Sequence, residues 1–454
     1  MAKQKKDTAK FDSTAPASQQ GTPLVALGWQ DLCGVTRVRA IPLNRLDGKL
    51  DYGLGFPSCM HGLSSTGGIV ANQWGPVDEV RQVPAPESLV QIPRTSDYPG
   101  FNLVMANSID PNGEPFECCI RHMYQSALDD LKSETGLEFC AAFEHEFMIS
   151  GDGFVPELCM ALGALRASEP MAGFLTAALE QAGFEVEAFE PEFGRGQYEL
   201  SLKPQWGMAA ADGTVAVREI IRDVARHFKL KATFTPKLAL DQVGNGAHIH
   251  FSMRDAKGNP ALFDASQPHG LSKLGGQFAA GIIRHVKALM PFAASSPVSY
   301  ARIGPSSWSA GFTAFGIMNR EAALRVCDLP GKTTRDRARG YNLEFRAADN
   351  LCNPYLVLMM LVRAGLQGIR EELPTPPALT VDPATLKAAE RKKLGIEPLP
   401  GSLGAALKCL EKDQMVRSWM PESLYQTLLS VKHDEIAGSP LDDPATYARY
   451  AETY

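Results

Sequence analysis

The chain has 454 residues, of which 44% are hydrophobic and 21% charged, a composition that can bury a large core in more than one domain. The 45 Lys and Arg residues against 51 Asp and Glu residues give a net charge of -6, which argues against a general attraction to nucleic acid or to an anionic membrane. The longest apolar run, residues 355–362, is far shorter than the about 20 residues that cross a bilayer.

The cysteines and the first residues predict a cytoplasmic protein. The nine cysteines include no C-x-x-C pair, although Cys118 and Cys119 are adjacent, and this pattern is typical of reduced thiols. The first six residues are basic but no apolar segment follows them, so they do not predict a signal peptide.

Taken in chain order, the sequence predicts three regions. Residues 1–22 are polar and aperiodic, which predicts a disordered arm. Residues 23–113 contain many turns and alternating segments such as 35–41, which predict a β-rich N-terminal domain. The turn-rich stretch 110–115 marks a boundary, and residues 114–454 are expected to form a second, larger domain.

The second domain mixes helical and alternating segments, which is typical of an α+β fold. Apolar spacing and helix start and stop residues predict five long helices, over residues 119–134, 170–181, 214–229, 272–289 and 354–369. Alternating segments between these helices predict strands.

The strand predicted over residues 142–147 carries the first candidate site residues. Glu144 and Glu146 project from one face, while Phe143 and Phe147 project from the other. Two carboxylates held side by side repel each other, and burial strengthens the repulsion. Because a bound divalent metal ion would compensate both charges, further ligands are expected elsewhere in the chain.

Three later segments also gather polar side chains. They are a Gly-x-Gly turn flanked by Glu192 and Glu199, a strand with His248, His250 and Ser252 on one face, and a strand with Asn342, Glu344 and Arg346 on one face. Each segment alone is more often structural, because a Glu-x-Glu strand is usually a solvated face and core histidines are common. Several such strands together indicate a funnel lined with ligands.

In their number and order, these segments resemble the glutamine synthetase superfamily. The resemblance is carried by Glu144-His-Glu146-Phe, Glu192…Gly196-Gln-Tyr-Glu199, Gly244-Asn-Gly-Ala-His248-Ile-His250-Phe-Ser252, Asn319-Arg320…Arg325 and Glu344-Phe-Arg346…Asn353-Pro-Tyr355. It covers about residues 24–450. The resemblance implies an N-terminal β-grasp domain followed by a catalytic domain with a curved antiparallel sheet.

The resemblance also implies two divalent metal sites. The ligands would be Glu146, Glu192 and Glu199 for one ion, and Glu144, His248 and Glu344 for the other. Five carboxylates and one imidazole form a hard ligand set that suits Mg²⁺ or Mn²⁺. Two such ions can neutralise the phosphates of ATP during phosphoryl transfer.

The substrate contacts follow from the same resemblance. The implied ATP-binding residues are His250, Ser252 and Arg325, the glutamate-binding residues are Gly244, Arg302 and Arg346, and the catalytic residues are Arg302, Arg320 and Arg346. Guanidinium groups fit carboxylates and phosphates with two parallel hydrogen bonds. The implied reaction forms γ-glutamyl phosphate from ATP and glutamate, and an amine nitrogen then attacks it.

The sequence departs from the ammonia-using members of the superfamily at the nitrogen site. Trp308 stands where they carry a flap Glu, and residues 56–60 lack the Asp that they carry. These changes predict a γ-glutamyl-amide ligase that uses an organic amine. Met60, Trp308 and Phe315 are expected to line the amine pocket. Because the stretches around them contain no acidic residue, they predict an alkyl monoamine or an arylamine.

Other functions stay open on the sequence alone. A glutamine synthetase that uses ammonia and a γ-glutamylpolyamine synthetase are the nearest alternatives. All six ligands persist, which disfavours a non-catalytic relative, and Arg302 and Arg346 persist, which disfavours a phosphagen-kinase-like enzyme. The expected partners are glutamate, ATP, an amine and other copies of the chain. The resemblance implies a dodecamer of two hexameric rings, in which one subunit's N-terminal domain completes its neighbour's active site.

Overall fold

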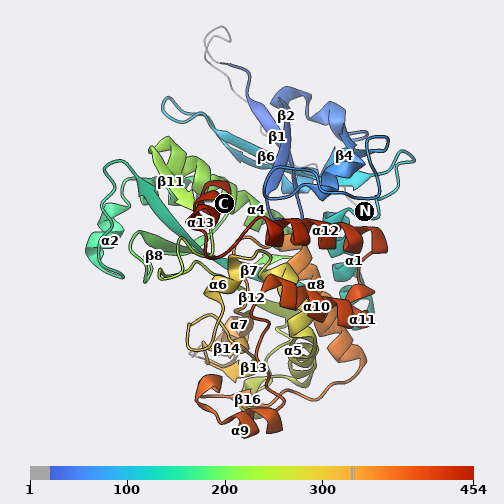
Figure 1. Ribbon diagram of the computed structural model, residues 1–454, viewed down its shortest axis with the longest axis vertical. Helices are drawn as coiled ribbons and strands as arrows, with labels where there is room; N and C mark the ends of the chain where they lie inside the picture. The colour runs from blue at the N-terminus through green and yellow to red at the C-terminus, as the bar shows by residue number, and fades with distance from the viewer. Residues whose placement is uncertain (1–20, 329–330, 332) are drawn as a thin grey trace.

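The computed structural model describes residues 21–328, 331 and 333–454, and its elements form an α+β fold (Figure 1). The arm predicted over residues 1–22 lies outside the described residues, apart from its last two positions. A six-stranded sheet and a ten-stranded sheet organise the chain, and Figure 1 shows the first of them, in blue and cyan, above the second. No helix in the described part of the chain is long and apolar enough to cross a membrane.

The first sheet combines antiparallel hairpins with one parallel pair. Its strands are β1 (Leu24–Gln30), β2 (Thr36–Pro42), β3 (Leu54–Pro57), β4 (Glu79–Pro84), β5 (Val90–Ile92) and β6 (Phe101–Ile109). The order is β2-β1-β6-β4-β3, with β5 also on β6, and β1 runs parallel to β6. Alternation in β1 buries Val25 and Leu27 against Val104 of β6. The β-grasp class expected for this sheet stays a prediction.

The second sheet has β7 at its centre, because this long strand pairs with several others. The strands are β7 (Glu138–Gly151), β8 (Val186–Pro191), β9 (Gln197–Leu202), β10 (Gln205–Trp206), β11 (Leu230–Thr233), β12 (Ala247–Arg254), β13 (Phe312–Ile317), β14 (Ala322–Cys327), β15 (Asn342–Phe345) and β16 (Ala378–Leu379). Their order is β16-β13-β14-β15-β12-β7-β9-β8, and β10 and β11 also pair with β7.

This sheet is mixed, so the expectation of a wholly antiparallel sheet is wrong at one end. Strands β14 to β8 pair antiparallel, but β13 runs parallel to both β14 and β16. The chain returns from β13 to β14 through four residues, 318–321. Asn319 holds this crossover, since its side-chain amide donates to the carbonyls of Leu379 and Val381.

Helices join the strands of the two sheets and follow the last strand. They are α1 (Ile120–Thr135), α2 (Leu162–Ala167), α3 (Met171–Gln181), α4 (Met208–His227), α5 (Lys273–Ala293), α6 (Ser299–Arg302), α7 (Thr334–Gly340), α8 (Pro354–Arg370), α9 (Ala388–Lys393), α10 (Leu403–Lys412), α11 (Gln414–Arg417), α12 (Glu422–Ala437) and α13 (Pro444–Thr453). Phe278 of α5 packs on Phe251 of β12 with ring centroids 5.9 Å apart. The polar side chains that alternate with Phe251 therefore project from the opposite face of the sheet.

Helices α5 and α8 approach each other closely enough to need glycine. A Cβ on Gly281 would lie 2.0 Å from the carbonyl oxygen of Ala364, and one on Gly368 would lie 2.1 Å from that of Gln277. Only glycine fits these positions without moving the helices apart. Helix α5 of this pair packs against β14 and, through Phe278, against β12.

Candidate active site

The strand register brings acidic and imidazole side chains together on the polar face of the second sheet. Glu144 of β7 lies opposite His248 of β12, and Glu146 of β7 lies opposite Glu199 of β9. Glu344 of β15 lies between its neighbours on β12 and β14. These pairings follow from alternation, because it gives each strand one polar and one apolar face.

Glu144, His248 and Glu344, the ligands expected for one metal ion, lie together. Their donor atoms all lie within 4.8 Å of one another. His248 Nδ1 lies 3.1 Å from Glu144 Oε2 and 3.9 Å from Glu344 Oε1. Such spacing lets all three side chains reach one ion with small side-chain movements.

Glu199 lies close to both of the other ligands expected for the second ion, Glu146 and Glu192. One group within the same distance limit is Glu146, Glu199 and His248, and another is Glu190, Glu192 and Glu199. Glu199 is therefore common to both groups, while His248 links the first of them to the neighbouring site. Glu190 was not assigned a role from the sequence, and its place opposite Glu199 in β8 explains its presence.

Burial and mutual repulsion perturb these carboxylates strongly. Burial, and then the charges of Glu144, Glu146 and the adjacent carboxylates, raise the pKa of Glu199 to about 9. The pKa of Glu192 is raised for the same two reasons. Burial also acts to raise the pKa of Glu144, but hydrogen bonds from His248 and His250 outweigh it and lower that pKa.

The donor set fits divalent metal ions. Nε2 of His248 is buried without a hydrogen-bond partner among the described residues, which leaves an imidazole nitrogen free to coordinate. A cation among these carboxylates would remove the repulsion that raises the pKa of Glu199. Carboxylate oxygens with one imidazole suit Mg²⁺ or Mn²⁺.

Glu344 also lies at the centre of a group of positively charged side chains. It pairs with the guanidinium groups of Arg325 and Arg346 through separate oxygens. Burial raises its pKa, but His250 and Arg346, followed by the other cations, outweigh burial and lower the pKa of Glu344 to about 2. His250 in turn lies 3.0 Å from Glu144 Oε1, and its Nδ1 lies 2.8 Å from Asn342 Oδ1.

A large cavity opens beside this cluster. Its volume is about 700 Å³, which falls within the range of small-molecule sites. Glu144, His250, Ser252, Arg320 and Arg325 all contribute to its lining. The residues expected to bind ATP therefore share one cavity with Glu144, one of the expected metal ligands, and with Arg320.

Two of the residues expected to bind glutamate, Gly244 and Arg302, lie side by side near His248. Arg302, at the end of α6, is buried and donates to the carbonyl of Ala348 over 2.6 Å, while its Nε has no partner in the part of the chain that the structure describes. A Cβ on Gly244 would lie 2.7 Å from Arg302 Cγ. Glycine at this position thus leaves the backbone open beside Arg302.

The loop at residues 304–311 contains Trp308 and crosses above Arg346. The Trp308 carbonyl accepts from Arg346 Nη2 over 2.8 Å, and its side chain is 69% exposed. The other two residues expected in the amine pocket lie elsewhere within one chain. Phe315 is buried in the main core, and Met60 lines a separate cavity of about 270 Å³ in the first sheet.

Besides Glu190, four residues of the site have no role assigned from the sequence: Gln197, Cys327, Glu321 and Asn350. Gln197 donates to Glu146 Oε2 over 3.1 Å and so orients a ligand. Cys327 donates to Glu344 Oε2 over 3.2 Å. The Gly196-Gln-Tyr-Glu199 motif was the only signal for Gln197. Glu321 reaches the site through the short crossover between β13 and β14, and Cys327 through the antiparallel pairing of β14 with β15.

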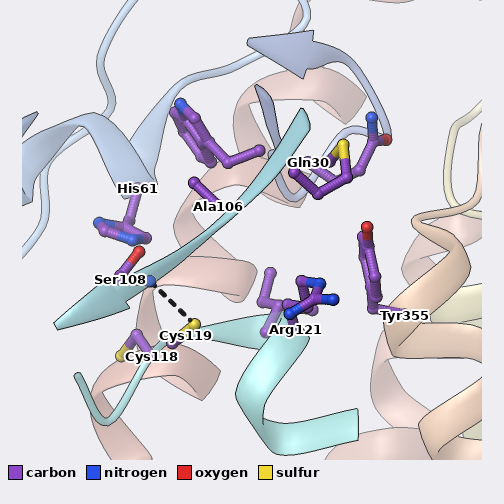
Figure 2. A pocket seen from close by; sticks show the side chains of 11 residues that line it. Gln30, His61, Ala106, Ser108, Cys118, Cys119, Arg121 and Tyr355 are labelled. Atoms are coloured by element: carbon purple, nitrogen blue, oxygen red, sulfur yellow. Dashed lines mark hydrogen bonds between the residues drawn. The ribbon is translucent and has the colours of Figure 1, made fainter. Parts of the chain in front are cut away.

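A third cavity, between the first sheet, α1 and α8, is too small for a substrate (Figure 2). Its volume of about 20 Å³ suits about one water molecule. His61 lines it, and the backbone N–H of Ser108 donates to Cys119 Sγ over 3.2 Å (Figure 2). Burial raises the pKa of the Cys118 thiol to about 12, which makes it a poor nucleophile at neutral pH.

The chain belongs to the glutamine synthetase family. A family model described as the glutamine synthetase catalytic domain matches residues 117–440, and one described as the glutamine synthetase N-terminal domain matches residues 12–116. The protein is therefore an ATP-dependent ligase of this family that forms C–N bonds.

Individual relatives show the same similarity. The chain is 33% identical to γ-glutamylpolyamine synthetase GlnA3 of Streptomyces coelicolor over 96% of this chain and 94% of that protein. It is also 33% identical to glutamine synthetase of Methanocaldococcus jannaschii over 71% of each chain. A crystal structure described as a novel glutamine synthase homolog is 36% identical over 96% of this chain and 99% of that chain, with a TM-score of 0.87.

A further solved structure supports the fold alone. The complex of GmaS with ADP has a TM-score of 0.78 and 24% identity, over 92% of this chain and 94% of that chain.

Proposed function

We propose that the enzyme joins the γ-carboxyl group of glutamate to an organic amine through γ-glutamyl phosphate. The observation that carries this proposal is the contrast between the two sides of the loop around Trp308. On the side of the loop that contacts Arg346, the groups needed to activate glutamate are all present: Arg346, Glu344 and the ligand cluster. On the loop itself, an exposed Trp side chain stands where ammonia-using members carry a carboxylate.

The chain's own residues would position and neutralise the reacting groups. Two divalent ions would be held by Glu144, Glu146, Glu192, Glu199, His248 and Glu344. When bound, such ions neutralise the charge that develops on a transferring phosphoryl group. Arg302 would pair with the glutamate carboxylate, while Arg320 and Arg325 would contact phosphate oxygens from the wall of the large cavity.

The amine class follows from the loop and its surroundings. Trp308 offers an aromatic surface, which suits an alkyl monoamine or an arylamine. Met60 and Phe315 would join this pocket only through a neighbouring subunit or through movement of the loop, since a single chain keeps them apart.

A γ-glutamylpolyamine synthetase is the second candidate. It is favoured by the 33% identity to a protein of that name and by two carboxylates at the loop. Glu321 accepts from the Trp308 N–H over 2.8 Å, and Asp382 accepts from the Ser306 hydroxyl over 3.0 Å. Neither acidic residue lies in the sequence stretches that predicted an uncharged pocket.

The proposal is tested by glutamate-dependent phosphate release from ATP with ammonium, ethylamine, aniline and putrescine, each as the only nitrogen source. We expect an organic amine to exceed ammonium in kcat/KM by at least about tenfold. Glu344→Gln should remove most of this activity, because Glu344 belongs to the ligand group and pairs with two arginines. A clear preference for ammonium would show a glutamine synthetase instead.

A further inference from the structure

Glu321 is a carboxylate beside the active site whose hydrogen bonding is incomplete. It lies in the crossover between β13 and β14, directly after Arg320. Its Oε1 accepts a hydrogen bond from the backbone N–H of Trp308 over 2.8 Å. Its Oε2 is buried and has no hydrogen-bond partner among residues 21–328, 331 and 333–454. An unpartnered buried acceptor is unfavourable unless a bound group supplies a donor.

Arg346 places Glu321 next to the reacting groups. Arg346 Nε donates to the carbonyl of Arg320 over 2.7 Å, and its Nη2 donates to the carbonyl of Trp308 over 2.8 Å. The third guanidinium nitrogen pairs with Glu344 in the ligand cluster. One side chain therefore connects the metal-ligating carboxylate, the loop and the residue that precedes Glu321.

The loop that covers Glu321 is held in an unusual backbone conformation. Ser306, Trp308 and Ala310 have φ angles of +52°, +57° and +71°, a region that residues other than glycine rarely adopt. Such conformations persist where surrounding contacts fix them. Here the contacts are those of Glu321 and Arg346 with the two ends of the same residue, Trp308.

We propose that Glu321 is the amine-side carboxylate of this enzyme and that it selects amines that are cationic at neutral pH. This inference rests on the proposed ligase function and refines its substrate class toward alkylammonium ions and away from arylamines. Oε2 accepts a hydrogen bond from the ammonium group of the amine. The negative charge of Glu321 thereby replaces that of the flap Glu, which Trp308 cannot supply. Oε1 keeps its bond to the loop.

The proton balance is complete with the named groups. Glu321 takes one proton from the bound ammonium, and the freed lone pair on nitrogen forms the C–N bond with the γ-carbonyl carbon. The C–O bond to the phosphoryl group breaks, and its electron pair leaves with phosphate. Phosphate takes the second proton from nitrogen, and Glu321 releases its own proton to solvent.

Glu321→Gln tests the charge without removing the loop contact. Glutamine retains an oxygen acceptor for the Trp308 N–H, but it cannot pair with a cation or take a proton. Ethylamine, a cation at neutral pH, is compared with hydroxylamine, which is mostly uncharged there and whose product is measured as γ-glutamyl hydroxamate. Glu180→Gln is the matched control, because it makes the same chemical change on the exposed surface of α3, away from the loop.

We expect Glu321→Gln to lower kcat/KM for ethylamine by at least about 100-fold, and to change that for hydroxylamine by less than about threefold. Ethylamine activity of the variant should rise tenfold for each pH unit, following the free base. Glu321→Asp should restore part of the preference for ethylamine, and Glu180→Gln should leave the preference unchanged.

Equal losses for both nucleophiles, or no loss, would overturn the inference, as would a wild-type preference for aniline. These outcomes leave the ligase function intact, since wild-type enzyme would still form hydroxamate. If wild-type enzyme forms no hydroxamate from ATP, glutamate and hydroxylamine, the proposed function itself is wrong and the inference falls with it.

Discussion

Glu199 is the carboxylate at which we expect protonation and metal binding to compete. It lies opposite Glu146 in one strand pair and opposite Glu190 in the other, and the structure groups it with Glu192 as well. Its pKa is raised to about 9, so in the metal-free protein it carries a proton at neutral pH. A carboxylate must lose that proton before it coordinates a metal ion.

We expect Mn²⁺ binding near neutral pH to release about one proton through Glu199. Calorimetric titrations in buffers of different ionisation enthalpy measure this number. Glu199→Gln should release fewer protons and bind Mn²⁺ at least about tenfold more weakly. Glu180→Gln, on the exposed surface of α3, should behave as wild type. Unchanged proton release in Glu199→Gln would contradict this assignment.

The same shift predicts how stability depends on pH. The unfolded chain loses the Glu199 proton near the ordinary value of 4.5, whereas the folded metal-free protein keeps it up to about 9. Between these two pH values the folded state therefore binds more protons than the unfolded state. The contribution of Glu199 to the free energy of unfolding falls as the pH rises through this range. Saturating metal should remove that decline, because the folded state then also holds an ionised Glu199.

The buried His61, in another part of the molecule, predicts the opposite dependence of stability on pH. It is buried near Trp29, Phe56, Trp74 and Phe116, and burial lowers its pKa from 6.5 to about 4. The unfolded chain thus binds a proton before the folded chain does. The contribution of neutral His61 to the free energy of unfolding is complete above pH 6.5. It is lost as the pH falls toward 4, and the loss is at most about 3 kcal/mol.

Urea unfolding at a series of acidic pH values tests this. His61→Phe keeps an aromatic ring but cannot titrate, so its free energy of unfolding should decline less steeply than that of wild type. Parallel curves for the two proteins would show that His61 does not contribute to the acid sensitivity.

At the scale of elements, β12 joins the core to the site. Its apolar residues Ile249 and Phe251 are buried, and the alternating residues His248 and His250 face the ligands. Gly246 lies just before this strand, where a Cβ would meet Glu146 Oε1 at 3.0 Å, Arg302 Nη1 at 3.1 Å and His248 Nε2 at 3.3 Å. All three atoms lie at the ends of site side chains.

We expect Gly246→Ala to impair function more than folding. The added methyl group would displace Glu146 and His248, so Mn²⁺ affinity should fall at least about tenfold, while unfolding free energy changes by about 1 kcal/mol or less. Gly48→Ala is the control, because no atom lies within 4 Å of its added Cβ. A large loss of stability with normal metal affinity would refute this explanation.

The helices show what the sequence can and cannot predict at this scale. Helix α8 agrees closely with the predicted 354–369, because Pro354 and a continuous apolar run define it. Helix α4 begins at Met208, six residues before the predicted start at Thr214. Small residues and Asp212 weaken the apolar pattern there. Asp212 is buried by its pairing with Arg121, a distant contact that local spacing does not reveal.

The candidate site also contains residues whose positions the sequence predicts and residues whose positions it does not. Five of the six proposed metal ligands lie on alternating strands, so motif and periodicity indicate which face each occupies, while Glu192 lies in the turn after β8. The structure brings all six into overlapping groups. Glu321 and Cys327 lie outside any motif quoted for the site. Glu321 belongs to the four-residue crossover between β13 and β14, and Cys327 lies opposite Asn342 in the β14–β15 pair. Sequence alternation alone predicts neither the crossover nor the strand pairing.

At the scale of the whole molecule, the amine pocket predicted from the sequence spans two distant places. Met60 lines a cavity of about 270 Å³ in the first sheet together with Phe56, whereas Trp308 lies on the loop beside Arg346. The division of the chain into domains at residues 23–113 and 114–454 stays a prediction. If both places serve one pocket, they come from two subunits.

We therefore expect a ring-shaped homo-oligomer, with twelve subunits in two hexamers, in which Met60 of one subunit faces Trp308 of the next. Light scattering gives the mass. Mixing tests the shared site: Glu344→Gln and Met60→Asp would each be inactive alone, since one impairs the ligand cluster and the other the contributed pocket. After dissociation and random reassembly of equal amounts, about a quarter of the sites would pair an intact ligand cluster with an intact Met60 and regain activity. A monomeric mass, or a reassembled mixture as inactive as its components, would show that each chain builds its amine pocket alone.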